Sequence, residues 1–502
     1  MNYIKHAITV VIAFFLISCS DDKSEVDGAL LEGTEITSFS FLQSNNSSLS
    51  SDIVFEINNN VISGRLPYSS DIEGLVSSFD HSGLEVEINN INQVSGLSVN
   101  DFSKGATYTV KTSDGRQEEY EVRSQYYTGL PIIYLNTYGT SIDSKEDYVN
   151  GTVSVYEGLA FHDLSASKMK IRGRGNSTWF LHPKKPFQLK FDDKTEMLGM
   201  AKDKKWLFLA EYSDKTMLRN TIAFEMGYIS NLDWTPLSTY AEVFINNSYN
   251  GTYNISQKVE ESDHRVQLGD SGYLLEIDQI ERLDEDDVYF YTDKFLINIK
   301  EPELEKNSLE YNYVKEYINE FEQVLFSSSF KTNNTGYINY IDLDSFIDWY
   351  LISEITKNVD SKHFSSIYLN LLPGEKIKMG PLWDFDLAFG NVDYADSQFT
   401  AGFWVKNHPW YNRLFQDDSF VSKVKKRFSY FKSNENFILD KIDFHAEHLK
   451  WAQKENDEKW KTIGTYVWPN PVVYDSYNEE VDHLKKWYSE RMNWLETALN
   501  NL

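Results

Sequence analysis

Residues 358–386 read NVDSKHFSSIYLNLLPGEKIKMGPLWDFD and place two aspartates in different settings. Asp360 follows a predicted helix, whereas Asp384 begins an Asp-Phe-Asp sequence 24 residues later, after a strand-like stretch and a Gly-Pro turn. In phosphoryl-transfer enzymes one carboxylate accepts the proton of the attacking hydroxyl, and a second one, past a short hairpin, holds Mg²⁺ on the nucleotide phosphates. The spacing is therefore typical of a phosphotransferase centre, although 76 Asp and Glu residues make chance pairs common.

The elements on either side of this stretch change from strands to helices. Strand patterns dominate from about residue 130 to 300, with one helix expected over Thr216–Met226. Afterwards helical spacing of apolar residues predicts helices over Ser308–Leu325 and Leu343–Ile355, the second capped by Asp344. A β-rich part followed by an α-rich part predicts an α+β domain over residues 130–500, in the order of a two-lobed protein-kinase-like fold.

Residues 36–125 have a different pattern. Short segments alternate apolar and polar residues, and Asn or Gly turns separate them at roughly ten-residue intervals. This predicts a small all-β sandwich, and its sequence resembles the immunoglobulin-like modules at the N-termini of Bacteroidetes surface lipoproteins. No catalytic constellation is visible in it, so we expect a spacer or docking module.

The N-terminus carries an apolar run of eleven residues, 7–17, after Lys5 and before Cys19. Such a run is too short to span a bilayer and predicts a lipoprotein signal peptide over residues 1–18, with lipidation of Cys19. Residues 19–35 are then an acidic tether, and the lipid anchors the protein to a membrane. Because the acidic pair after Cys19 resembles an export tag of Bacteroidetes-type lipoproteins, we expect a surface-exposed position on the outer membrane, with inner-leaflet placement as the alternative.

Composition excludes several classes of protein. The formal net charge of −28 repels nucleic acid, so no nucleic-acid partner is expected. Cys19 is the single cysteine of the chain, which excludes an intramolecular disulfide and a cysteine-based metal cluster.

Two basic segments could bind phosphate. Residues 172–176 read RGRGN and place two arginines and two glycines on a tight turn after a strand, where backbone N–H groups and guanidinium groups can surround phosphate oxygens. In the next strand, alternation puts Phe187 and Leu189 on one face and Lys190 on the other. Lys185 and Lys190 are therefore candidates to contact a nucleotide, although a basic hairpin tip and exposed lysines are the simpler interpretations.

Several further motifs occur in one order and together resemble the CotH family, the atypical kinases named for spore coat protein H. They are Pro186–Lys190, Trp206-Leu207, Asp214-Lys215-Thr216, Leu218-Arg219-Asn220, Val243–Asn246, Tyr249–Tyr253, Gly272–Asp278, Pro409-Trp410, Arg413-Leu414-Phe415, Trp468-Pro469-Asn470 and Trp487. With the arginine-glycine turn and the two aspartate motifs, the resemblance covers roughly residues 130–497. It implies a divergent kinase-like fold that binds ATP with Mg²⁺ and phosphorylates Ser or Thr of a protein.

The resemblance also implies roles for individual residues. Asp360 takes the catalytic role, Asn358 braces its loop, and Asp384 holds the metal with Asp386 as a second candidate ligand. The residues implied in phosphate binding are Arg172, Arg174, Asn176, Lys185 and Lys190. One departure concerns Ser365, which stands where a protein kinase has a metal-binding Asn. Serine is a poorer Mg²⁺ ligand than an amide, which puts a second metal site in doubt.

Other functions remain open at this point. A non-catalytic adhesion or envelope-assembly protein on the same fold would fit Ser365 and the scarcity of ATP outside the cytoplasm. Glycan hydrolysis would need two acids roughly 5 to 9 Å apart across a sugar-sized cleft. A serine protease is disfavoured because the sequence Gly269-Asp270-Ser271-Gly272 lacks the last glycine of that motif. We interpret His445 and His448 as part of a solvated helix face rather than as a metal site.

Overall fold

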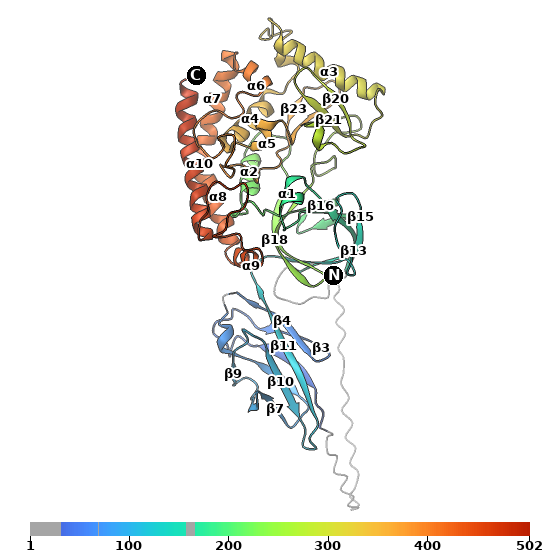
Figure 1. The fold of residues 1–502 in the computed structure, drawn as a ribbon, viewed down its shortest axis with the longest axis vertical. Helices are drawn as coiled ribbons and strands as arrows, with labels where there is room; N and C mark the ends of the chain where they lie inside the picture. Colours follow the sequence, from blue (N-terminus) through green and yellow to red (C-terminus); the bar gives the residue numbers. More distant parts are fainter. Residues whose placement is uncertain (1–31, 69, 157–165) are drawn as a thin grey trace, which may run out of the picture.

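The computed structural model describes residues 32–68, 70–156 and 166–502 (Figure 1). The predicted signal peptide, Cys19 and most of the predicted tether lie outside these residues. The described chain forms an elongated molecule with a β module at one end, a barrel in the middle, and an antiparallel sheet and helices at the other end. The predicted α+β class is confirmed. That the N-terminal module is immunoglobulin-like and that the rest has a two-lobed kinase-like fold both stay predictions.

The N-terminal module consists mainly of two sheets around one core that includes Phe39, Phe41 and Tyr108. One sheet has the order β2-β1-β6 and the other β3-β4-β11-β10-β7-β8. Its strands are β1 (Ile36–Phe41), β2 (Ile53–Val54), β3 (Glu56–Asn58), β4 (Val61–Pro67), β5 (Leu75–Val76), β6 (Ser78–His81), β7 (Glu85–Ile88), β8 (Ile91–Asn92), β9 (Val99–Asn100), β10 (Ala106–Lys111) and β11 (Gln117–Tyr127). The long strand β11 leads directly towards the barrel.

The next seven strands close into a barrel, which the sequence did not predict. They are β12 (Ile132–Asn136), β13 (Val149–Tyr156), β14 (Ser167–Gly173), β15 (Phe187–Met197), β16 (Met200–Leu209), β17 (Ser238–Ile245) and β18 (Ser248–Gln257). Alternation identifies strands but not closure, which here depends on the parallel pairing of β12 with β17, for example Ile133 with Val243. Phe187 and Leu189 do point into the barrel core, as their alternation predicts.

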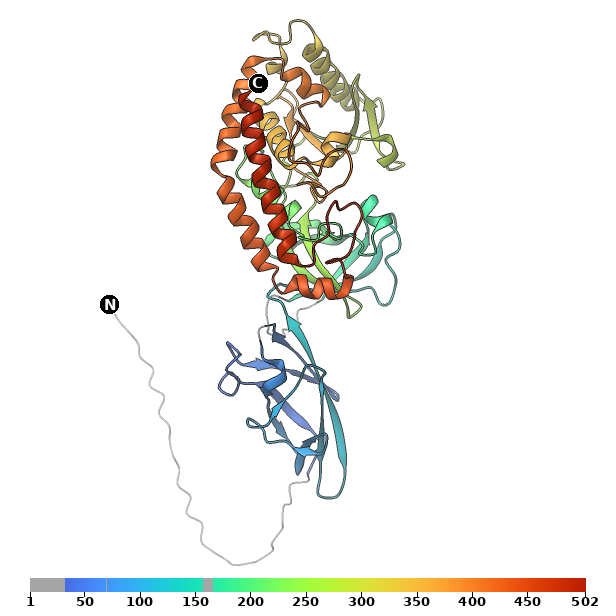
Figure 2. The same cartoon turned by 60° about the vertical axis from the view of Figure 1, so that its left-hand side comes forward.

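A five-stranded sheet with the order β20-β21-β19-β22-β23 lies beyond the barrel. Its strands are β19 (Tyr273–Asp278), β20 (Val288–Tyr291), β21 (Leu296–Glu301), β22 (Ile367–Leu371) and β23 (Lys378–Met379). The helices are α1 (Ser177–Leu181), α2 (Arg219–Tyr228), α3 (Leu309–Phe326), α4 (Leu343–Thr356), α5 (Val359–His363), α6 (Pro409–Leu414), α7 (Asp418–Ser433), α8 (Glu435–His448), α9 (Ala452–Trp460) and α10 (Tyr477–Asn500). Helix α10 packs against α4, α7 and α8 and follows the long axis of the molecule (Figure 2).

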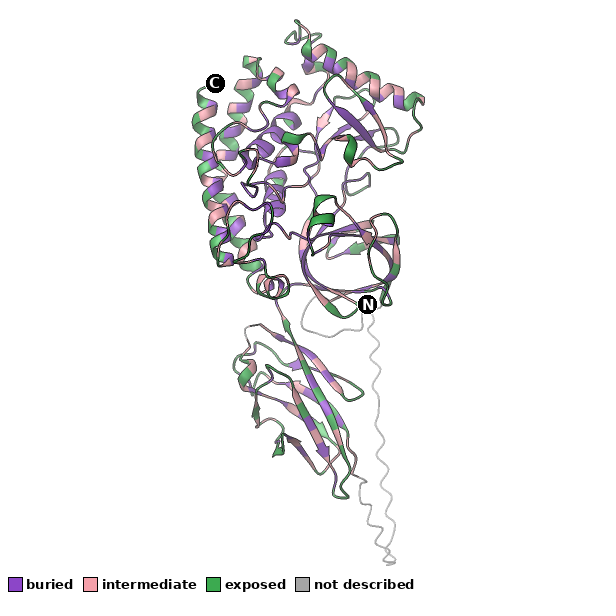
Figure 3. Cartoon of the chain, in the orientation of Figure 1, coloured by how far each residue is buried: buried purple, intermediate pink, exposed green. Residues whose placement is uncertain are grey.

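Helix α4 anchors the helical part because every residue from Ser345 to Thr356 is buried (Figure 3). Its cap is Asp342, which accepts a hydrogen bond from Ser345 N at 2.8 Å, and not the predicted Asp344. Although α4 is apolar, no helix among the described residues combines the length and the hydropathy needed to cross a membrane.

Candidate active site

Six of the predicted site residues line one cleft of about 320 Å³ between the barrel and the five-stranded antiparallel sheet. They are Arg172, Arg174, Asn176, Asp360, Asp384 and Asp386. They come from the end of β14 and the turn that follows it, from the first turn of α5 and from the loop after β23. The fold therefore brings basic and acidic groups together from segments that are about 200 residues apart in the sequence.

Asp360 is held in a short, capped helix. Helix α4 ends at Thr356, and its C-cap Lys357 has a left-handed conformation. Asn358 then caps α5 by accepting a hydrogen bond from Ser361 N at 3.2 Å. The Arg282 guanidinium lies 3.5 Å from the Asp360 carboxylate. Burial and the nearby charge of Asp384 raise the pKa of Asp360 to about 7. A carboxylate with a pKa near neutrality can take a proton from a hydroxyl during a reaction.

Asn358 joins the two aspartate segments although it does not line the cleft. Its Nδ2 donates a hydrogen bond to the carbonyl oxygen of Asp384 at 3.3 Å. Its own carbonyl oxygen accepts a hydrogen bond from Trp404 Nε1 at 2.5 Å. The side chain is 4% exposed, so its place in the structure is that of a brace and not of a group that contacts a ligand.

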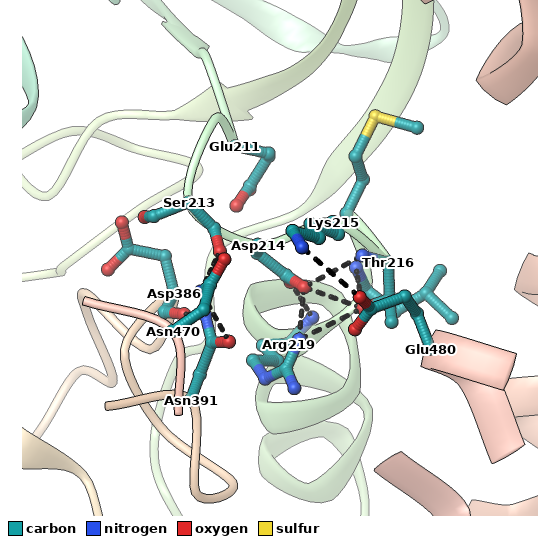
Figure 4. A network of polar contacts seen from close by, with 12 residues as sticks. Glu211, Ser213, Asp214, Lys215, Thr216, Arg219, Asp386, Asn391, Asn470 and Glu480 are labelled. Atoms are coloured by element: carbon teal, nitrogen blue, oxygen red, sulfur yellow. Dashed lines mark hydrogen bonds and ion pairs between the residues drawn. The ribbon is translucent and has the colours of Figure 1, made fainter. Parts of the chain in front are cut away.

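The loop that follows β23 is fixed to the start of α2. Phe385 N donates to Asn220 Oδ1 at 2.7 Å, and Arg219 Nε donates to the carbonyl oxygen of Ala388 at 3.1 Å. Asn391 then donates to the carbonyl oxygen of Ser213 at 3.1 Å, within the buried polar network of Figure 4. This network holds the Asp384 segment against the loop that precedes α2.

The acidic residues of the cleft fit a divalent cation. Burial and the charge of Asp384 raise the pKa of Asp386 well above its ordinary value. A cation between these carboxylates would relieve their repulsion, and oxygen ligands are those that Mg²⁺ prefers. Among the described residues no group of three or more His, Cys, Asp or Glu side chains is arranged to hold a metal by itself. Phosphate oxygens and water would therefore have to complete the coordination of Mg²⁺ at Asp384 and Asp386.

The two arginines of the turn have different surroundings. Arg174 lies over the Trp383 ring, with its guanidinium carbon 5.4 Å from the ring centroid, and it faces Asp384 and Asp386. Burial lowers its pKa, but an arginine stays protonated in proteins. Arg172 lies over the Tyr148 ring at 5.0 Å. Gly175 between Arg174 and Asn176 has φ of +82°, a conformation that glycine adopts without strain.

Lys185 and Lys190, by contrast, are not among the residues that line the cleft. Lys185 Nζ donates to the carbonyl oxygen of Trp179 at 2.5 Å and so supports α1. Lys190 lies beside the Tyr148 ring, 6.0 Å from its centroid. Their neighbour Lys184 is buried and donates to Asn456 Oδ1 at 2.9 Å, and burial lowers its pKa to about 7. Sequence spacing could not distinguish these lysines because the curvature of the barrel decides which strand residues face the cleft.

Sequence reasoning also missed groups on and next to the antiparallel sheet. Glu276 and Asp278 of β19, Lys300 of β21, and Arg282 from the turn after β19 line the same cleft. Ser365, the residue at the position of the kinase Asn, donates from Oγ to Asp278 Oδ1 at 2.7 Å. The available signal was the alternation of Glu276 and Asp278 on one face of a strand that otherwise consists of apolar residues.

His445 and His448 lie on α8, and we interpreted both as part of a solvated helix face rather than as a metal site. His445 is nevertheless not on a solvated face. Its Nε2 lies 2.9 Å from Glu225 Oε1, and its side chain is 15% exposed. It therefore joins α8 to α2, which also carries the residues that hold the Asp384 loop.

Comparison with known proteins identifies the family of the chain. The profile of the family described as CotH kinase protein matches residues 171–495. No curated protein matches the chain. Among solved structures, a candidate glycoside hydrolase from Bacteroides thetaiotaomicron is 12% identical, with 53% of this chain and 82% of that chain covered. The TM-score of that match is 0.15, so it carries no argument about fold or activity. Because the family profile spans more than half of the chain, the resemblance seen in the sequence is confirmed and this protein belongs to the CotH family.

Proposed function

We propose that this protein is a surface-anchored atypical kinase that transfers the γ-phosphoryl group of ATP to a Ser or Thr hydroxyl of an envelope or extracellular protein. The single observation that carries the proposal is the meeting of Asp360, Asp384 and Arg174 in one cleft. Anchoring is proposed through a lipid on Cys19 in the outer membrane. The family of the chain supports a kinase-like activity.

In this mechanism Asp360 orients the acceptor hydroxyl and takes its proton. The oxygen of Ser or Thr forms a bond to the γ-phosphorus while the bond from that phosphorus to the β-phosphate oxygen breaks, and ADP leaves. Arg172, Arg174 and Asn176 bind and orient the phosphates. Asp384 and Asp386 would hold Mg²⁺, which when bound would supply positive charge against the phosphates.

The charges of the cleft support a requirement for divalent cations. Eight acidic and five basic side chains line it. ATP would add further negative charge to this group of carboxyl groups, and Mg²⁺ would offset part of that charge. Glycan hydrolysis also uses carboxylates, but it has no need of the two guanidinium groups of Arg172 and Arg174.

One observation favours the non-catalytic alternative. The Ser365 hydroxyl donates a hydrogen bond to Asp278. The hydroxyl therefore points to that carboxylate and does not take the metal-binding role that Asn has at this position in protein kinases. A binding protein on the same fold would tolerate this loss. The retained Asp360, Asp384 and Asp386 and the arginine-glycine turn favour the kinase.

Intact-mass analysis tests the proposal. The purified protein is incubated with Mg²⁺-ATP and a generic basic acceptor protein, beside an Asp384→Ala control. We expect a gain of one phosphate that is absent in the control. A gain of a nucleoside monophosphate would instead mean nucleotidyl transfer. No change in mass, together with no ATP-dependent shift in melting temperature, would favour the binding protein.

A further inference from the structure

We propose that Asn220 of α2 is a positioning residue that fixes the metal ligand Asp384 by holding the peptide unit between Asp384 and Phe385. Asn220 does not line the cleft and is 4% exposed. Its effect on the reaction would therefore be exerted through the backbone of the loop. The inference rests on the proposed kinase function for its kinetic consequences, but not for its structural ones.

The N–H and the carbonyl group of the peptide unit between Asp384 and Phe385 each form a hydrogen bond to a different asparagine side chain. The N–H of Phe385 donates to Asn220 Oδ1 at 2.7 Å. The carbonyl oxygen of the same peptide unit, that of Asp384, accepts from Asn358 Nδ2 at 3.3 Å. Rotation of this peptide plane would break both hydrogen bonds, and it would leave the buried amide groups without partners.

The peptide unit needs such support because Asp384 has φ of +61°. For a residue with a Cβ atom this left-handed conformation is unfavourable in free energy. It persists where several surrounding contacts hold the backbone in place. The conformation sets the direction of the Asp384 side chain into the cleft. If the plane were free to turn, the carboxylate would sample directions in which it cannot hold a cation on the phosphates.

Glu211 fixes the orientation of the Asn220 amide. Asn220 Nδ2 lies 3.1 Å and 3.3 Å from the two carboxyl oxygens of Glu211. An inverted amide would place its oxygen against this carboxyl group and its NH₂ group against Phe385 N–H. The orientation that presents Oδ1 to Phe385 is therefore the one that satisfies every partner. Helix α2 adds a second point of attachment, because Arg219 Nε donates to the carbonyl oxygen of Ala388.

Asn254 of β18 offers a matched control for Asn220. Its Nδ2 also approaches Glu211, at 3.4 Å, and the residue is 0% exposed. Its other hydrogen bond goes to Thr221 Oγ1 at 3.2 Å, and none goes to the Asp384 loop. Truncation of either asparagine removes a buried amide next to the same carboxyl group, but only Asn220→Ala removes the partner of Phe385.

Hydrogen–deuterium exchange of the full-length protein tests the structural part without any ligand. Asn220→Ala is expected to speed exchange in the segment 383–391 by about tenfold, while Asn254→Ala leaves that segment within about twofold of the wild type. Equal effects of the two variants would overturn the proposal. If Asn220→Ala does not fold, the same exchange measurement is made on Asn220→Ser, because the serine side chain is too short to reach Phe385.

Kinetics and cation binding then separate the positioning role from the proposed function. Asn220→Ala is expected to raise the Mg²⁺ concentration for half-maximal transfer and to lower kcat by about a hundredfold, with KM for the acceptor unchanged. Mn²⁺ binding measured by electron paramagnetic resonance should weaken in parallel. Loss of protection in Asn220→Ala together with an inactive wild type would leave the positioning role standing and reject the kinase. If the wild type is active but Asn220→Ala and Asn254→Ala bind Mn²⁺ equally well, the positioning role is rejected and the kinase proposal stands.

Discussion

Ser365 Oγ donates a hydrogen bond to Asp278 Oδ1 at 2.7 Å, and this bond links the segment after α5 to the end of β19. Asp278 Oδ1 also accepts from Gln279 N at 2.8 Å, so two donors hold one carboxylate oxygen of a residue that lines the cleft. Although burial raises the pKa of Asp278, both hydrogen bonds oppose that rise by favouring its ionised form. The serine therefore supports an acidic group of the site.

The first prediction concerns this pair. Ser365→Ala removes one of the two donors and leaves Asp278 less well oriented, so kcat/KM should fall roughly five- to tenfold, in line with about 1 kcal/mol for one hydrogen bond. The melting temperature should change little, because the other partner of Asp278 remains. Steady-state kinetics and thermal unfolding check both statements. An unchanged kcat/KM would show that Asp278 has no part in the reaction.

A second prediction separates the arginines from the lysines. Arg174→Ala removes a guanidinium group that faces Asp384 and Asp386 in the cleft, so KM for ATP should rise by about tenfold or more. Lys190→Ala changes a residue that does not line the cleft and should leave KM within about twofold. Initial rates over a range of ATP concentrations measure both values. A larger effect from Lys190 would contradict the assignment of the phosphate site.

The third prediction is a pH profile. The pKa of Asp360 is raised to about 7, and only the ionised carboxylate can accept the proton of a hydroxyl. As pH falls through 7, this carboxylate is protonated, so kcat/KM should decline with decreasing pH and level off above about pH 8. Rates between pH 5 and pH 9 test this, with acceptor and Mg²⁺-ATP below saturation. A profile that is flat across pH 7 would exclude Asp360 as the base.

The fourth prediction concerns stability at a site away from the cleft. Burial raises the pKa of Glu242 to about 7, from 4.5 in the unfolded chain. Between these values the folded protein binds more protons than the unfolded one, so the free energy of unfolding should fall as pH rises from 4.5 to 7. The loss is about 3 kcal/mol at most, at 1.36 kcal/mol for each pKa unit. Glu242→Gln should remove this part of the pH dependence in urea titrations, because its hydroxyl partners, among them Thr128, can donate or accept.

Local sequence patterns allowed many of the helices and strands to be predicted. The main feature that they did not predict is the closure of seven strands into a barrel. Helix α4 follows directly from apolar spacing, and it appears at Leu343–Thr356 against the predicted Leu343–Ile355. The barrel could not be predicted because parallel pairing of β12 with β17 joins segments about a hundred residues apart, and alternation carries no information on distant partners.

The same limit applies to the site. Asp360, Asp384 and Arg174 were found because their residue types and turns carry the chemistry. Lys190 was misplaced because alternation gives a face of a strand but not what lies opposite that face. Asn220 was named only as part of a family motif and without a role, because a hydrogen bond to a backbone N–H, that of Phe385, cannot be inferred from residue types.

The most direct test of the central claim follows the phosphoryl group itself. The wild type and Asp384→Ala are each incubated with Mg²⁺ and an acceptor protein, with ATP radiolabelled in either the γ or the α position. We predict that label reaches the acceptor from the γ position only, and that Asp384→Ala, shown to be folded by its melting curve, transfers none. Label from the α position, equal labelling by both proteins, or no labelling by the wild type would contradict a metal-dependent phosphoryl transfer in this cleft.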